Sequence, residues 1–341
     1  MHNYILFEEK NQIGKITLNR SPALNALNHA MFVALYQKLT SWKNNSAIKL
    51  ILIRSNSEKA FCAGGDIRAI YENKHQSMDV VNGYFRLEYE IDRMIFHYHK
   101  PTVALMHGIT MGGGVGISLY ASHCVAADNL RWAMPETTIG FFPDVGATYY
   151  LSRLPDFIGV YLALTGNAID AETALHLNLI KKIIAYDQFD AVEQALMNAD
   201  GDIENHTVVS VILEKFSKKI ADQKNYLPNE KIKKYFQYNT VERIIDTLQE
   251  DKCDWAQETV STLLRRSPTS LKVTLKQLQW AKEKTFDEVI AMDNKIARVM
   301  LQRHDFFEGV RAAIIDKDKK PRWEPNKLAE VSDKEVDLYF N

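Results

Sequence analysis

Three apolar runs in the first half of the chain limit the fold more than any other feature. They read KLILIR at 49–54, PTVALM at 101–106 and HCVAA at 123–127. Short runs of this kind are typical of parallel strands that are covered on both faces. Stretches with helical periodicity, at 28–43 and 79–98, lie between or before them and supply the crossovers that parallel strands need. The first half is therefore predicted to form a parallel, helix-covered sheet, an α/β architecture.

The pattern changes near residue 186. Strand signals end there, and amphipathic helical patterns with Lys and Glu faces continue to about residue 313. The run DKDKKPR at 316–322 is predicted to be a solvated charge cluster. We expect two parts: an α/β core at 1–185 and a mainly helical C-terminal region at 186–341.

The bulk composition excludes several classes of partner. The 341 residues include 42 basic and 43 acidic side chains, a net charge of −1, which does not favour nucleic acid or an anionic membrane surface. The most apolar stretch, 101–127, contains histidines and several glycines, so no membrane span is predicted. The three cysteines have no disulfide or metal spacing, and the N-terminus has no leader-like pattern. A cytoplasmic location is expected, although a processed organellar protein would have the same features.

Two glycine-rich segments follow predicted strands. They are FCAGGD at 61–66 and GITMGGG at 108–114, and each precedes a predicted helix. Free backbone N–H groups at such positions favour negative charge, and glycine lets a ligand approach the main chain. Two such amides that converge on one point would form an oxyanion hole. The alternative is that the glycines only permit tight turns and close packing; dinucleotide and Walker spacings do not fit.

Two acidic residues stand in an apolar and aromatic segment. Glu136 and Asp144 lie in AMPETTIGFFPDVG at 133–146, each directly after a proline that restricts the backbone. A carboxyl group in such surroundings tends to have a raised pKa, which suits proton transfer. A structural role remains an alternative for both acids, and for Asp144 this would be the N-cap of a helix at 145–152.

Taken together, these segments resemble the crotonase (enoyl-CoA hydratase/isomerase) superfamily. The likeness lies in FCAGGDIR, GITMGGGVG and AMPETTIGFFPDVGATYYL, and it extends in the right order over nearly the whole chain. The resemblance implies a spiral core of repeated ββα units with a mainly helical C-terminal part. That part would either complete an acyl-CoA site or cover the core.

The resemblance also implies roles for individual residues. Gly65 and Gly113 would donate their N–H groups to a thioester oxygen. The residues implied along the coenzyme-A channel, largely through main-chain atoms, are Leu24, Ala26, Ala63, Asp66 and Ile67. The residues implied to meet the acyl part are Glu88, Gly113, Glu136 and Asp144. For Glu88 a solvated helical face is the alternative.

One departure from the hydratase pattern indicates the reaction. Hydratases of the superfamily carry two glutamates, one after the second glycine loop and one at the place of Glu136; here the first place holds Gly116. Water addition across a double bond then lacks one acid–base partner. The remaining carboxylate beside an oxyanion hole suits thioester cleavage, with Glu136 as nucleophile or as general base.

The expected activity is hydrolysis of a short 3-hydroxyacyl-CoA thioester, foremost 3-hydroxyisobutyryl-CoA from valine breakdown. Alternatives are an enoyl-CoA hydratase, a broader acyl-CoA thioesterase and a non-catalytic acyl-CoA-binding homologue. The expected partner is a small-molecule acyl-CoA, with coenzyme A as part of the substrate, no further cofactor and no metal. Trimers are common in the superfamily, so a homo-oligomer is one expected state; the helical C-terminal region could instead cover such surfaces.

Overall fold

The computed structural model describes residues 4–73, 78–199, 202–219 and 227–341. The chain forms two compact units, and each is made of three separate segments. The first unit contains residues 1–65, 90–133 and 169–226; the second contains 66–89, 134–168 and 227–341. This division differs from the predicted boundary at residue 185, because packing between distant segments is not visible in a linear pattern.

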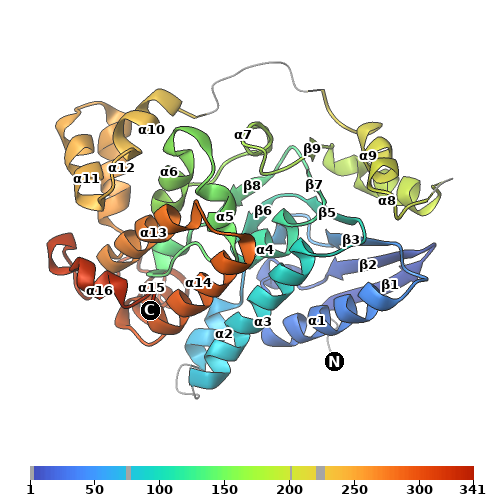
Figure 1. The fold of residues 1–341 in the computed structure, drawn as a ribbon, viewed down its shortest axis with the longest axis horizontal. Helices are drawn as coiled ribbons and strands as arrows, with labels where there is room; N and C mark the ends of the chain where they lie inside the picture. Colours follow the sequence, from blue (N-terminus) through green and yellow to red (C-terminus); the bar gives the residue numbers. More distant parts are fainter. Residues whose placement is uncertain (1–3, 74–77, 200–201, 220–226) are drawn as a thin grey trace. The chain divides into compact units, whose positions relative to one another are not determined.

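The first unit is built on a six-stranded sheet (Figure 1). β1 pairs with β2 in antiparallel orientation, and all other neighbours in the sheet are parallel. The three apolar runs form the neighbouring strands β3, β5 and β7, which confirms the predicted parallel sheet. In spatial order the strands are β1 (Ile5–Lys10), β2 (Ile13–Leu18), β3 (Leu50–Ser55), β5 (Thr102–Met106), β7 (His123–Ala126) and β9 (Lys182–Ile183).

A second, three-stranded parallel sheet lies in the same unit. Its strands are β4 (Ala60–Cys62), β6 (Ile109–Met111) and β8 (Arg131–Ala133), in that order. Each follows a strand of the larger sheet along the chain, and helix α4 (Gly113–Leu119) follows β6. This is the repeated ββα order that the resemblance implies. Because β4 and β6 are parallel neighbours, their C-terminal ends, and with them the two glycine loops, lie at one edge.

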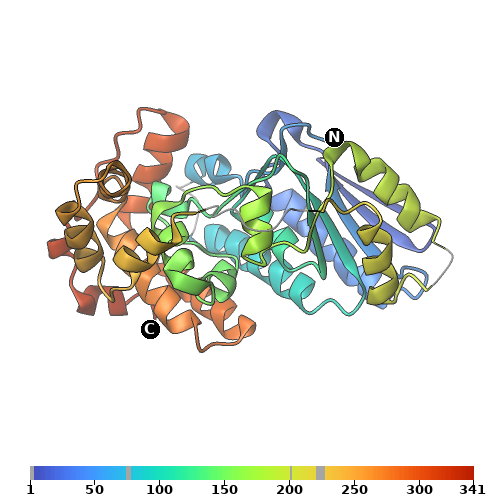
Figure 2. The ribbon, with the colours of Figure 1, turned by 90° about the horizontal axis from the view of Figure 1, so that it is seen from above.

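Helices cover both faces of the large sheet. One face carries α8 (Phe189–Met197) and α9 (His206–Glu214), whose apolar side chains share a core with β3, β5 and β7. The other face carries α1 (His29–Asn44), since Trp42 lies against Gly14 of β2 and successive strand residues alternate between faces. Figure 2 shows these two layers. Asn28 caps α1, because its side-chain oxygen accepts from the Met31 N–H at 3.0 Å. The short helix α7 (Ala171–His176) also lies within this unit.

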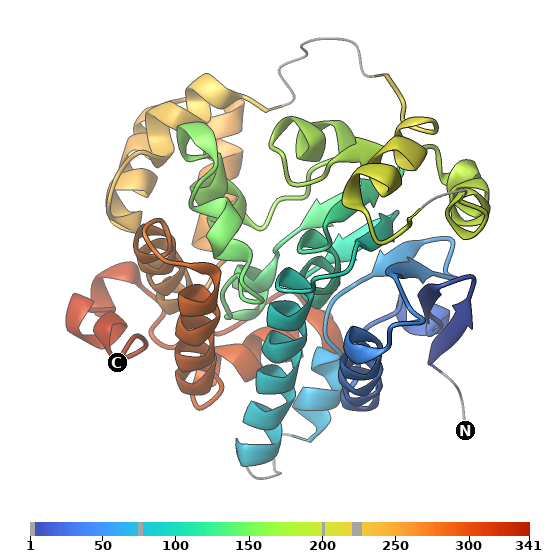
Figure 3. The same cartoon turned by 45° about the vertical axis from the view of Figure 1, so that its right-hand side comes forward.

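The second unit is helical, and the described residues contain no strand in it. The long α3 (Met78–Phe96) begins in this unit and ends in the first. α13 lies at its centre and contacts α5, α6, α11 and α16, and Figure 3 shows the group formed by α10, α11 and α12. The helices are α2 (Ile67–Glu72), α5 (Ala147–Leu151), α6 (Ile158–Thr165), α10 (Asn229–Phe236), α11 (Val241–Glu250), α12 (Asp254–Leu264), α13 (Pro268–Ala281), α14 (Phe286–Met300), α15 (His304–Val310) and α16 (Asp333–Asp337).

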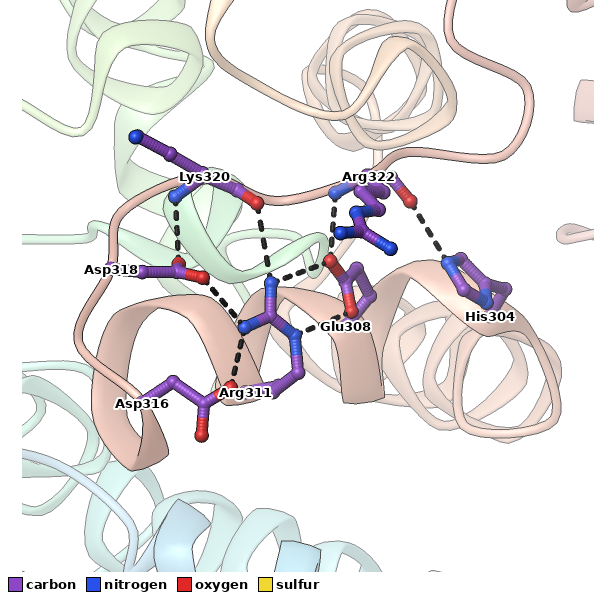
Figure 4. A network of polar contacts seen from close by, with 7 residues as sticks. All are labelled: His304, Glu308, Arg311, Asp316, Asp318, Lys320 and Arg322. Atoms are coloured by element: carbon purple, nitrogen blue, oxygen red, sulfur yellow. Dashed lines mark hydrogen bonds and ion pairs between the residues drawn. The ribbon is translucent and has the colours of Figure 1, made fainter.

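The charged run at 316–322 is organised around one arginine (Figure 4). The Arg311 guanidinium donates two hydrogen bonds of 2.9 Å to the Glu308 carboxylate, and others to Asp316 at 2.6 Å and Asp318 at 2.8 Å. The hydrogen bonds that Arg311 donates to these three carboxylates raise its pKa. The charged run is therefore held against α15 by these contacts. The prediction of a solvated charge cluster did not include them.

Candidate active site

The first glycine loop follows β4 in the first unit. Gly64 has φ +106°, a conformation that residues with a Cβ rarely adopt. The Leu27 N–H donates to the Gly64 carbonyl at 2.8 Å, which fixes the loop against the segment before α1. In the described parts of the chain the N–H of Gly65 donates to no other residue. This amide is therefore free to meet a ligand.

The second glycine loop follows β6 and touches the first. An added Cβ at Gly64 would lie 3.2 Å from the Met111 carbonyl oxygen and 3.6 Å from the Gly113 nitrogen. An added Cβ at Gly114 would lie 2.4 Å from the Cys62 carbonyl oxygen. Gly113 is the first residue of α4, so its N–H has no partner within the helix. The glycines thus permit an approach of the two loops that no side chain would allow.

Three of the residues implied for coenzyme A gather beside these loops. Leu24 lies in a left-handed turn, and its carbonyl accepts from the Ala63 N–H at 3.0 Å. The Ala26 carbonyl accepts from the Arg20 guanidinium at 2.9 Å. Asn25 organises this turn, since it is fully buried and its amide donates to the Ser55 hydroxyl at 2.7 Å. Asn25 could not be singled out from the sequence, because one asparagine in a turn has no distinctive pattern.

The other two implied coenzyme-A residues belong to the second unit. The Asp66 carboxylate caps α2 by accepting from the Ala69 N–H at 3.2 Å, and Ile67 is the first residue of that helix. The Asp66 N–H donates to the Tyr84 hydroxyl at 3.0 Å. Both residues directly follow Gly65 in the chain, and Asp66 has ordinary structural partners.

Glu136 is buried in the second unit. It begins a short 3-10 helix, Glu136–Ile139, and it is 8% exposed. Within the described parts of the chain its Oε2 atom has no hydrogen-bond partner. An unpaired carboxylate oxygen in such surroundings is energetically unfavourable, so it indicates a functional role over a purely structural one.

Asp144 lies on a strained turn. Its Oδ2 accepts from the Tyr89 hydroxyl at 2.8 Å, and its carbonyl accepts from the Ala147 N–H at 2.9 Å. The next residue, Val145, has φ +52°, which is unusual for a β-branched side chain. α5 begins at Ala147 with Gly146 as its N-cap, and no side chain caps it. The N-cap alternative for Asp144 is therefore not what the structure shows.

Glu88 faces inward from α3. It is 3% exposed, so the alternative of a solvated helical face is wrong. Its neighbour Tyr89 is fully buried and provides the contact to Asp144. The sequence analysis did not single out Tyr89, although its position beside Glu88 in the chain could have indicated it.

The acids of this unit form an electrostatically linked set. Burial, and then the charge of Asp144, raise the pKa values of Glu88 and Glu136 well above their usual range. Burial raises the pKa of Asp144 to about 7, against an opposing hydrogen bond from Tyr89. Such acids stabilise the fold while protonated, that is below their ordinary pKa values near 4. For Asp144 this contribution is lost as the pH rises through about 7, and for Glu88 and Glu136 it is lost as the pH rises through their raised pKa values.

In the first unit, a side chain of α3 packs closely against Gly116. An added Cβ there would lie 2.6 Å from the Asp92 Oδ1 atom, and Asp92 is fully buried on α3. A glutamate at 116 would have to displace this aspartate. The absence of a second glutamate after the glycine loop is thus built into the packing around α4.

Two further polar side chains beside the glycine loops have structural roles. His107 Nε2 lies 2.5 Å from the Ser57 carbonyl oxygen, and burial lowers the pKa of this histidine. The Cys62 thiol is buried and donates to the Asn25 carbonyl at 3.2 Å. No group of three or more His, Cys, Asp or Glu in the described ranges could hold a metal ion. None of the helices in these ranges is long and apolar enough to cross a bilayer.

Comparison with known proteins places the chain in a family. The profile of the family described as enoyl-CoA hydratase/isomerase matches residues 13–340. A Bos taurus protein named mitochondrial 3-hydroxyisobutyryl-CoA hydrolase is 40% identical over 98% of this chain and 88% of its own length. The Homo sapiens protein of that name is 39% identical over the same shares.

Two solved structures have the same fold along the whole chain. One is described as a carnitinyl-CoA dehydratase from Mycobacterium thermoresistibile, with a TM-score of 0.91, 31% identity, and coverage of 100% of this chain and 97% of that one. The other is described as an enoyl-CoA hydratase from Rhodobacter sphaeroides 2.4.1, with a TM-score of 0.89, 31% identity, and coverage of 99% and 97%. The crotonase-like α/β fold expected from the sequence is therefore confirmed. The chain belongs to the enoyl-CoA hydratase/isomerase family.

Proposed function

We propose that this protein hydrolyses a short 3-hydroxyacyl-CoA thioester, foremost 3-hydroxyisobutyryl-CoA, to the free hydroxy acid and coenzyme A. The observation that carries the proposal is the buried Glu136, whose Oε2 atom has no partner in the described chain and whose pKa is raised by burial. The names of the Bos taurus and Homo sapiens relatives support the choice of substrate. A place in valine breakdown belongs to the same proposal.

In this mechanism the thioester oxygen accepts from the amides of Gly65 and Gly113. Each such donor lowers the barrier by about 2.7–4 kcal/mol. The Glu136 carboxylate bonds to the carbonyl carbon, the C–S bond breaks, and the coenzyme-A thiolate takes up a proton. Water then opens the mixed anhydride at the Glu136 carbonyl, which releases the hydroxy acid and restores the carboxylate. Asp144 and Glu88 bind the substrate hydroxyl and help to move protons.

Labelled water tests the nucleophilic route against general-base catalysis. In a single turnover in ¹⁸O-water, opening of the anhydride at Glu136 places the label in the Glu136 side chain, which peptide mass spectrometry detects. Label that is confined to the product acid would contradict this route and support a water molecule activated by Glu136.

Release of free thiol from a panel of acyl-CoAs tests the activity itself. The panel contains 3-hydroxyisobutyryl-CoA, 3-hydroxypropionyl-CoA, isobutyryl-CoA and acetyl-CoA. We expect the two hydroxyacyl substrates to give the highest kcat/KM, and full activity with a metal chelator present, because the proposal needs no metal or further cofactor. Equal rates for all four would indicate a broad thioesterase, and no thiol release would indicate a binding protein.

Hydration of an enoyl-CoA is the second candidate, since both solved structures are described as enzymes that add or remove water. The packing of Gly116 against Asp92 argues against it. We expect that Gly116→Glu produces no crotonyl-CoA hydration, measured as loss of the enoyl absorbance, and destabilises the fold by about 1–3 kcal/mol through overpacking. Gly116→Glu combined with Asp92→Ala should regain part of this stability in urea unfolding. Hydration by the single variant, or by the wild type, would contradict the proposal.

The activity should depend on pH through Glu136. Because the nucleophile must be ionised and its pKa is raised, kcat/KM should still climb with pH above the range in which an ordinary glutamate is already fully ionised. The negative charge of Asp144 is one cause of the shift. Asp144→Asn should therefore lower the maximal rate and also move the climb to lower pH. A flat profile above pH 5 in the wild type would contradict the raised pKa.

The cellular location and the oligomeric state of the protein are part of the proposal. We retain the expected cytoplasmic location, although the named relatives are described as mitochondrial. Cell fractionation with an antibody against this chain decides between the two. A homo-oligomer is proposed by analogy with the superfamily, and light scattering of the purified protein measures it.

A further inference from the structure

We infer that Asp293 and Gln277 form a clamp that holds the turn carrying Asp144, and that they are positioning residues for this acid. The clamp is defined as these two side chains with their contacts to Pro143 and Gly146. The inference rests on the proposed function, in which Asp144 binds the hydroxyl of the substrate. Nothing in the sequence pattern near Asp144 indicates these partners, which lie more than 130 residues further along the chain.

The clamp grips the turn on both sides of Asp144. After it, the Gly146 N–H donates to Asp293 Oδ2 at 2.7 Å. Before it, the Pro143 carbonyl accepts from Gln277 Nε2 at 3.2 Å. The same Gln277 nitrogen donates to Asp293 Oδ1 at 2.8 Å, so the hydrogen bonds on the two sides of Asp144 belong to one network.

Both clamp residues stand on rigid elements. Asp293 belongs to α14 and Gln277 to α13, and both side chains are fully buried. Burial, and then the charge of Asp144, raise the pKa of Asp293 well above its usual range, while the bonds from Gly146 and Gln277 oppose the shift. A buried acid is expensive for a fold to keep, so its retention here favours a specific task.

The turn needs such a clamp because its backbone is strained. Val145 has φ +52° and Gly146 has φ +76°. A non-glycine residue in a sparsely populated backbone region is unfavourable and persists only where its surroundings impose that conformation. The clamp bonds the residues on either side of Asp144 and Val145, so it holds the conformation that points the Asp144 carboxylate at the Tyr89 hydroxyl.

The test replaces Asp293 with Asn, which preserves the shape but not both acceptors. In the native contacts each carboxylate oxygen of Asp293 accepts one hydrogen bond from an N–H group. An asparagine has only one side-chain oxygen, so one of these two hydrogen bonds is lost. We expect kcat/KM for 3-hydroxyisobutyryl-CoA to fall on the order of 100-fold, as for a displaced catalytic contact. The rate with isobutyryl-CoA, which has no hydroxyl for Asp144 to bind, should change much less.

The ratio of the activity with 3-hydroxyisobutyryl-CoA to the activity with isobutyryl-CoA distinguishes a positioning role from a purely stabilising one. It should fall in Asp293→Asn and in Gln277→Leu, and adding Asp144→Asn to either should lower it no further. Asp305→Asn is the matched control: it removes another buried acid of the same unit, bonded to Ser267 and Glu324, and should lower the melting temperature without changing the ratio. An unchanged ratio in both clamp variants would overturn the inference.

A second readout does not depend on the proposed activity. Hydrogen exchange of peptides that cover residues 143–147 should accelerate in Asp293→Asn and in Gln277→Leu, but not in Asp305→Asn. Unchanged exchange means that there is no clamp, whatever the enzyme does. Accelerated exchange in a protein that releases no thiol from any acyl-CoA means that the clamp stands, but that the proposed function, and the role of Asp144 with it, fails.

Discussion

Glu136→Gln should remove nearly all thioesterase activity and leave the fold intact. The amide has the shape of the carboxylate but cannot attack a carbonyl or accept a proton, so kcat should fall by at least about 10²–10⁴-fold, the range for a lost general base, and further if Glu136 is the nucleophile. The measurement is thiol release under saturating 3-hydroxyisobutyryl-CoA.

The stability of the same variant provides its control. Burial disfavours the ionised form of Glu136 and raises its pKa, so a neutral side chain at this position should be tolerated well. We expect the melting temperature at pH 8 to equal or exceed that of the wild type, because the variant has no charge to bury. Turnover close to that of the wild type would show that another residue carries the chemistry.

Gly114→Ala should damage the proposed oxyanion hole, although Gly114 itself is not one of its proposed donors. The new methyl group would lie 2.4 Å from the Cys62 carbonyl oxygen and 2.8 Å from the Cys62 Cβ, so one of the two glycine loops must shift. Loss of one oxyanion donor lowers kcat by about 10²–10³-fold, and overpacking destabilises by about 1–3 kcal/mol. Steady-state kinetics and urea unfolding measure the two effects.

Gly83→Ala is the matched control for this substitution. Gly83 lies inside α3, and an added Cβ there meets nothing within 4 Å. Alanine in a helix is about 0.5–1 kcal/mol more favourable than glycine, so this variant should be slightly stabilised and fully active. If Gly114→Ala kept the kinetics of the wild type, the close approach of the loops would have no catalytic importance.

The sheet was predictable because each buried strand is a local pattern. KLILIR, PTVALM and HCVAA became β3, β5 and β7, with every end within one residue of the prediction. The glycine loops were predictable for the same reason, since strand, loop and helix follow one another directly in the chain. Their approach to within contact distance was not, because it depends on the pairing of β4 with β6.

The acids were only partly predictable. Glu136 and Asp144 stood out among apolar neighbours, whereas Asp293 and Gln277 lie in segments with many charged residues. A signal was nevertheless present: Asp293 lies on the buried face of α14 with Val289, Ile296 and Met300. A polar residue within an apolar helical stripe is informative, because it must find a partner inside the protein. Which partner it finds depends on tertiary packing, which periodicity does not reveal.

The interleaved segments have a consequence for how the protein is made. The turn with Glu136 and Asp144 leaves the ribosome well before α13 and α14, whose side chains bond it. Domains usually fold as units during synthesis, but the second unit here is incomplete until the final segment, 227–341, has emerged. The turn that carries Asp144 must therefore wait more than 100 residues of translation for its partners Gln277 and Asp293, although Tyr89 has already emerged, and no cut at a single point would release either unit whole.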